Sequence, residues 1–144
     1  MSRKGKTLKG PTVDNKLHQG SDELDYPVLC FKHLTTNKKY NIQRFKTPRE
    51  KAKAYGALFF LIEDMQSHTW KELHTRAKKK GIESILAGRI KFKPNNFNMT
   101  PDTKLLVLRF YRQKYRVIGM KSEVNNAVFH VLGFDFDYSA YDHG

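Results

Sequence analysis

The spacing of apolar residues predicts one strong helix near the middle of the chain. The run TPREKAKAYGALFFLIEDMQ opens with Thr47, Pro48 and Glu50. Thr and Glu at this spacing can form a capping box, and proline suits the first helical position. Six apolar residues that recur at helical spacing are then expected to face the core: Ala52, Tyr55, Leu58, Phe59, Ile62 and Met65.

A second helix is predicted over residues 70–80. Thr69 and Glu72 repeat the capping box, and Gly81 is suited to a left-handed helix end. Few residues separate this helix from the first, so we expect a tight helical hairpin. Its last turns carry Arg76, Lys78, Lys79 and Lys80. These cations can stabilise the negative end of the helix dipole, and a phosphate contact is an open alternative.

The rest of the chain is β-rich. Residues 26–34 (YPVLCFKHL) predict a short buried strand, and LLVLRFYR, KYRVIGMKS and AVFHVLGFD predict three strands joined by short turns, an antiparallel meander. Residues 82–92 are weakly patterned and can add one more strand, whereas residues 93–103 predict a loop. The expected fold is a two-layer α+β domain, with the helical hairpin on one sheet face and the other face free for a ligand.

Two segments follow from composition. Residues 1–25 contain few apolar side chains and predict a flexible basic arm, and residues 26–144 predict a single α+β domain. The arm's cations can follow phosphates without sequence preference, or the arm can have no role.

The charge of the chain favours a polyanionic partner. Lys and Arg number 27 against 14 Asp and Glu, which gives a formal charge of +13 and makes nucleic acid the leading candidate, with an acidic protein as the alternative. The single cysteine, Cys30, excludes a disulfide framework. Without an apolar stretch of about 20 residues or an apolar signal-peptide segment, we expect a cytoplasmic protein that does not enter a membrane.

The strand motifs RFYRQKYRVIGMK and VFHVL, followed by an end rich in Tyr and His, resemble the RelE/ParE superfamily of bacterial toxins. The resemblance covers residues 26–143 by element order and implies a helical hairpin on a small antiparallel sheet, with an acidic antitoxin as partner. The comparable positions are Arg109, Tyr115, Arg116, Val117, Val128, His130, Val131, Leu132, Tyr141 and His143. The chain departs from the family at Gly119, where many members carry an apolar residue or Tyr, and at the Asp-rich end.

The ribonuclease branch of that family implies a catalytic site. Its members let the RNA 2′-hydroxyl attack the adjacent phosphate without a metal or other cofactor. By resemblance, Arg109 and Arg116 would bind the phosphate as bidentate donors, and His143 and Tyr141 would transfer protons or stack on a base. The expected nucleic-acid contacts are Arg112, Lys114, Lys78, Lys79 and Lys80.

Several residues have two interpretations. His130 can be structural or functional, and Asp135, Asp137, Asp142 and His143 can bind a divalent cation or form an acidic edge that rests against cations. A third set of aromatic residues lies among Lys and Arg and can stack on bases or fill the core: Phe45, Phe92, Phe97 and Tyr111.

Two functions follow as hypotheses. The first is an RNA-binding toxin-like protein, and a candidate metal-independent mRNA endoribonuclease, from a bacterial toxin–antitoxin pair. The alternative is a non-enzymatic module from a phage or mobile element that binds nucleic acid or a protein. No P-loop, dinucleotide fingerprint, nucleophile elbow or zinc-protease motif is present, so those chemistries have no support in the sequence.

Overall fold

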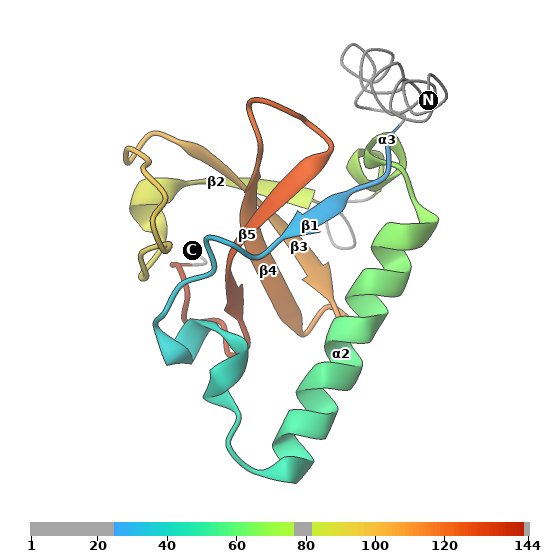
Figure 1. The fold of residues 1–144 in the computed structure, drawn as a ribbon, viewed down its shortest axis with the longest axis vertical. Helices are drawn as coiled ribbons and strands as arrows, with labels where there is room; N and C mark the ends of the chain where they lie inside the picture. The colour runs from blue at the N-terminus through green and yellow to red at the C-terminus, as the bar shows by residue number, and fades with distance from the viewer. Residues whose placement is uncertain (1–24, 77–81, 143–144) are drawn as a thin grey trace, which may run out of the picture.

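A computed structural model describes residues 25–76 and 82–142 of the chain (Figure 1). It contains a five-stranded sheet in the order β1-β5-β4-β3-β2. The strands are β1 Val28–Cys30, β2 Ile82–Leu86, β3 Lys104–Phe110, β4 Tyr115–Lys121 and β5 Val128–Asp135. β1 is parallel to β5 and every other pair is antiparallel. The long helix α2, Pro48–Ser67, runs beside the sheet, so the predicted α+β class is confirmed (Figure 1).

The β-rich half matches the predicted meander of β3, β4 and β5. Residues 82–92 supply β2 and the short 3-10 helix η4 Ala87–Arg89. The first predicted strand is shorter than residues 26–34, because only Val28–Cys30 bonds to β5 and the chain then turns away. Residues 1–24 of the basic arm predicted over residues 1–25 lie outside the described residues. So do five other residues named above: Lys78, Lys79, Lys80, Gly81 and His143.

Helix α2, Pro48–Ser67, begins where the sequence predicts. Thr47 and Glu50 form the expected capping box. The predicted core face is wrong. The buried side chains of α2 are Ala54, Ala57, Leu61 and Met65. Of the six residues predicted to face the core, only Met65 is buried and Leu58 is partly buried. Apolar side chains of α2 lie on both its buried and its exposed sides. The small Ala54 and Ala57 allow close approach to the sheet, whereas the bulky Tyr55, Phe59 and Ile62 remain exposed.

The second helix, α3 Trp70–His74, ends six residues before the predicted Lys80. The N–H of Thr75 bonds to the carbonyls of Leu73 and Lys71, and the chain then leaves the helical path. Arg76 turns back to α2, where its Nη2 lies 2.6 Å from Oδ1 of Asp64. The second arm of the predicted hairpin is therefore little more than one turn within the described residues.

The first face of the sheet, under α2, carries the larger core. Trp70 is fully buried there, and its Nε1 donates a hydrogen bond to the Ala127 carbonyl at 3.0 Å. Its ring lies edge-on to Phe129, with centroids 5.7 Å apart. Sheet residues of this face include Leu108, Val117 and Phe134.

The second face of the sheet is covered, contrary to the prediction that it is free for a ligand. It carries Leu105, Val107, Ile118 and Leu132, which pack against side chains from connecting segments. These segments include the 3-10 helix η2 Lys38–Tyr40, η4, the loop after η4 and the residues after β5. They contribute Tyr40, Ala87, Phe92, Ala140 and Tyr141. Loops that looked polar in sequence therefore supply the third layer of the fold.

A β-bulge in β5 changes which face its later residues occupy. Ile118 pairs with Gly133 and Gly119 pairs with Val131, so Leu132 is an extra residue on β5. Because side chains alternate between sheet faces, this insertion moves Asp135 onto the second face. Both glycines are sterically required: a Cβ at Gly119 would lie 2.2 Å from the His130 carbonyl oxygen, and one at Gly133 would lie 2.4 Å from the Phe92 ring.

Candidate nucleic-acid interface

The two predicted arginines lie side by side. Arg109 on β3 pairs directly with Arg116 on β4, because the turn between them is tight, and Arg116 pairs in turn with Asp135 on β5. Glu83 on β2 approaches Arg109 from the other side, with Oε2 3.7 Å from Nη2. These four residues, Glu83, Arg109, Arg116 and Asp135, form a charged row across four strands on the second face.

The charged row is less open than the sequence suggests. Arg116 is only 2% exposed, and its guanidinium carbon lies 4.0 Å from the centre of the Tyr138 ring. Nε and Nη1 of Arg116 and Nε of Arg109 are buried without an acceptor in the described part of the chain. Guanidinium N–H groups bind phosphate oxygens well. The row could therefore hold a phosphate, provided that Tyr138 moves aside.

The two tyrosines near the carboxyl end have opposite properties. Tyr138 is 54% exposed, and a hydrogen bond from Arg116 together with the charge of that guanidinium lowers the pKa of its phenol. Tyr141, which the resemblance implies as catalytic, is buried and donates a hydrogen bond to Oε1 of Glu83 at 2.7 Å. Burial, followed by this hydrogen bond, raises the pKa of Tyr141 well above its usual range. Tyr138 is therefore the more easily ionised group beside the arginines.

The tip of the β3–β4 hairpin is strained and basic. Tyr111, Arg112 and Gln113 have φ angles of 52°, 55° and 67°, a left-handed conformation that costs non-glycine residues on the order of 1 kcal/mol each. Arg112 and Lys114 are exposed there. The three successive left-handed residues turn these two cations outward, next to the aromatic side chains described next.

An aromatic row runs from the hairpin tip to both neighbouring segments. Tyr111 stacks on Tyr115 with ring centroids 5.1 Å apart and planes at 24°, and Tyr115 meets Phe136 edge-on at 5.0 Å. Phe136 contacts Phe45 at 4.8 Å, and Phe60 of α2 approaches Tyr111 at 6.4 Å. The row consists of Phe60, Tyr111, Tyr115, Phe136 and Phe45. All five rings are at least partly exposed, so base stacking on them is geometrically possible.

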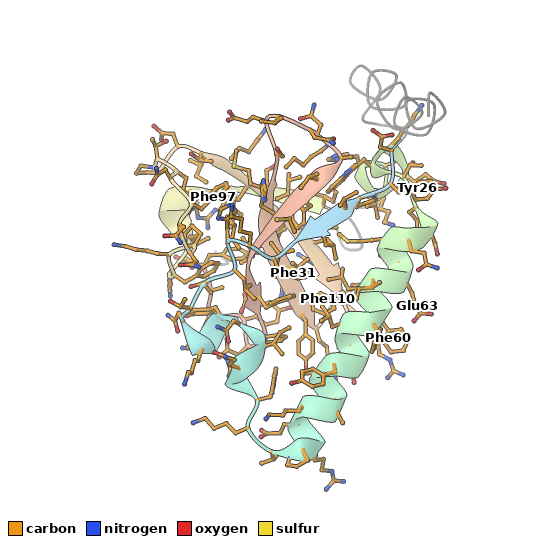
Figure 2. All side chains as sticks on the ribbon, in the orientation of Figure 1. Tyr26, Phe31, Phe60, Glu63, Phe97 and Phe110 are labelled. Atoms are coloured by element: carbon orange, nitrogen blue, oxygen red, sulfur yellow. The ribbon has the colours of Figure 1, made fainter. Side chains whose placement is uncertain are left out.

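Two other predicted aromatic residues do not belong to this surface. Phe92 is a core residue of the second face. Phe97, labelled in Figure 2, packs instead against His33 and His130, at 4.8 Å and 5.6 Å. Burial, aided by the nearby His33 and Lys32, lowers the pKa of His130, and its Nδ1 is buried without a described hydrogen-bond partner. These contacts favour the structural interpretation of His130.

The aspartates near the carboxyl end engage nearby protein groups. Asp137 pairs with Arg44 at 3.1 Å, and hydrogen bonds from Ser139 together with Arg44 lower its pKa despite the opposing effect of burial. Oδ1 of Asp135 accepts the N–H of Ser139 at 3.0 Å. Within residues 25–76 and 82–142, no three His, Cys, Asp or Glu side chains lie close enough to hold a metal ion.

Sequence reasoning missed Glu83, Tyr138 and three members of the aromatic row. Glu83 and Tyr138 reach the arginines through packing between distant segments, for which the sequence carries no local signal. Tyr115 and Phe136 could have been found from the sequence, because Tyr115 begins β4, Phe136 follows β5, and both have charged neighbours in the sequence.

No helix in the described ranges is long and apolar enough to cross a membrane.

Comparisons with protein-family models, with curated proteins and with solved structures give no match to this chain.

Proposed function

We propose that this protein binds single-stranded RNA at the tip of the β3–β4 hairpin. The observation that carries the proposal is the stacked pair Tyr111 and Tyr115, which flanks the exposed cations Arg112 and Lys114 in the sequence of the hairpin tip. Bases stack on such rings with about 1–3 kcal/mol each, whatever their identity, while adjacent cations neutralise the phosphates. The formal charge of +13 adds attraction over a longer range.

The proposal is tested by removing charge at the tip. The Arg112→Gln/Lys114→Gln variant should bind a short fluorescent RNA more weakly, because two phosphate contacts are lost. The slope of log affinity against log salt should become shallower by about 1.4, at roughly 0.7 per contact on single strands. Both side chains are exposed, so the fold should be unaffected.

A matched control separates a local contact from net charge. Lys91→Gln/Lys93→Gln removes the same charge from exposed positions on either side of the core residue Phe92. It should leave the salt slope almost unchanged. Equal losses in the two double variants would show that the RNA responds only to total charge, and the proposed interface would be wrong.

A second candidate function, metal-independent RNA cleavage, is favoured by the contact of Tyr138 with Arg116. The 2′-oxygen would attack the adjacent phosphorus while its proton passes to the Tyr138 phenolate. The 5′-oxygen of the next nucleotide would leave and take a proton from solvent, giving a 2′,3′-cyclic phosphate. Arg109 and Arg116 would stabilise the extra negative charge on the phosphorus centre.

Cleavage has its own test. Wild type should cut an RNA transcript in EDTA, alone or on ribosomes, and Tyr138→Phe should be slower by about 100-fold or more. RNA binding with no cleavage by wild type would remove this candidate and support the non-enzymatic module. In a toxin–antitoxin pair, an acidic antitoxin would compete with RNA for the exposed cations.

A further inference from the structure

The outer face of α2 carries two large aromatic residues in an unusual setting. Phe59 and Phe60 are 65% and 60% exposed, near the middle of a 20-residue helix. Gly56 lies one turn before Phe60, and a Cβ placed on Gly56 would have no neighbour within 4 Å. Glycine is unfavourable at such a position by about 1 kcal/mol relative to alanine. Two exposed rings beside a bare stretch of backbone are typical of a helix face that packs against another helix.

This face contains a pattern that is complementary to itself. Arg49 precedes Gly56 by seven residues and Glu63 follows it by seven, so both lie about 10 Å from Gly56 along the helix, at about 1.5 Å per residue. Residues seven apart lie on almost the same side of an α-helix, and all three are exposed. Figure 2 labels Glu63 and Phe60 on α2.

If two copies of α2 crossed antiparallel at Gly56, the charged and aromatic side chains around Gly56 would each meet a suitable partner. Arg49 of each copy lies opposite Glu63 of the other, Ala52 lies opposite Phe59, and Lys53 lies beside the Phe60 ring. Opposite charges therefore meet twice, each Phe59 covers a small residue, and each Phe60 gains a cation. A parallel arrangement would instead bring like charges together. Within residues 25–76 and 82–142, neither Arg49 nor Glu63 takes part in an ion pair.

We propose that the outer face of α2 binds a second copy of this chain, as an antiparallel two-fold dimer with Gly56 on the symmetry axis. A two-fold contact uses the same patch on both partners, so it needs this kind of self-complementary charge. The inference does not rest on the proposed RNA function, although the two surfaces meet at Phe60, which also approaches Tyr111 of the aromatic row. It uses the aromatic and charged side chains that the structure leaves on the outer side of the helix.

Charge reversal tests the pairing. Arg49→Glu and Glu63→Arg should each weaken self-association of the full chain at least tenfold in analytical ultracentrifugation, and the double variant should restore it. Arg49→Glu lowers the net charge and Glu63→Arg raises it, so a response to net charge alone would move the two single variants in opposite directions. Both changes favour the helix dipole, so neither should unfold α2.

Gly56 gives a second test. Gly56→Gln should leave the monomer as stable as wild type or more so, because the helix gains a better helix former and the site is open, yet it should abolish dimerisation. In a Cys30→Ser background, Gly56→Cys should form an oxidised dimer readily, because paired Cα atoms about 6 Å apart suit a disulfide. Gln66→Cys should not, since the two copies would lie about 30 Å apart.

The same experiments can overturn the proposal. A wild-type chain that sediments as a monomer at every concentration, or a double charge-reversal variant that stays as weak as the single ones, would rule out the two-fold contact. The outer face of α2 would then be a surface for a different protein.

Discussion

Replacing Gly119 with alanine should destabilise the fold by about 3 kcal/mol, the upper end of the usual cost of overpacking. The added Cβ would lie 2.2 Å from the His130 carbonyl oxygen and 2.6 Å from the Phe129 ring. Phe129 is fully buried in the core under α2, and the His130 carbonyl belongs to the neighbouring strand, so neither can move without disturbing the bulge. For a chain of this length, 3 kcal/mol corresponds to a fall in Tm of about 10 °C.

Urea unfolding followed by circular dichroism measures this cost, and Gly56→Ala supplies the matched control. The chemical change is the same, but Gly56 is in an open helical site, so its replacement should stabilise the monomer by about 1 kcal/mol. Both variants are measured at concentrations low enough to keep the chain monomeric. A Gly119→Ala variant within about 0.5 kcal/mol of wild type would refute the packing argument, because a change of that size is ordinary for an uncrowded surface site.

Three further results are expected. Because a hydrogen bond from Arg76 lowers the pKa of Asp64 below 3.8, this carboxylate contributes stability at neutral pH that is lost as pH falls through its folded pKa. Asp64→Asn should therefore cost about 1 kcal/mol at neutral pH, and urea titrations should show less further loss in acid than for wild type. Trp70→Phe should cost about 2 kcal/mol in the same assay, because it leaves a cavity and removes the hydrogen bond to the Ala127 carbonyl. Since Arg116 lowers the pKa of Tyr138, spectroscopic titration should show one tyrosine ionising below its ordinary pKa of 10.0, and Tyr138→Phe should remove that transition.

Local signals in the sequence predicted the starts of elements well and their ends poorly. Thr47 and Thr69 each cap a helix with side chains only three residues away, so the two helix starts follow from neighbouring residues. The end of α3 depends on Arg76 returning to Asp64, a contact across twelve residues. Basic residues that suit a helix end therefore did not predict where α3 stops, at His74.

The buried face of α2 could not be chosen from periodicity, because apolar residues lie on both sides of the helix. Ala54 and Ala57 offer much less apolar surface than Tyr55 and Phe59, yet the small side chains are the ones that fit against the sheet. The difference between the predicted and the observed buried face leaves large aromatic side chains exposed on α2. The proposed dimer contact follows from those side chains.

Half of the candidate site was predictable. A tight turn fixes Arg109 opposite Arg116, so their pairing follows from sequence spacing alone. Asp135 reaches the same face only because Leu132 is a bulge residue, and nothing local distinguishes Leu132 from its apolar neighbours. Glu83 and Tyr138 depend on the packing of β2 and of the segment after β5, which sequence patterns do not specify.

Mapping where RNA contacts the protein tests the proposed interface at the β3–β4 hairpin directly. Ultraviolet crosslinking of a uridine-rich single strand to the full chain, followed by mass spectrometry of the peptides, should place the crosslinks on Tyr111, Tyr115 or Phe45. Phe31 and Tyr26 are more exposed than these three rings but lie outside the aromatic row, so they should remain unmodified. Crosslinks confined to those two residues, or no crosslinks at all, would contradict the proposed interface.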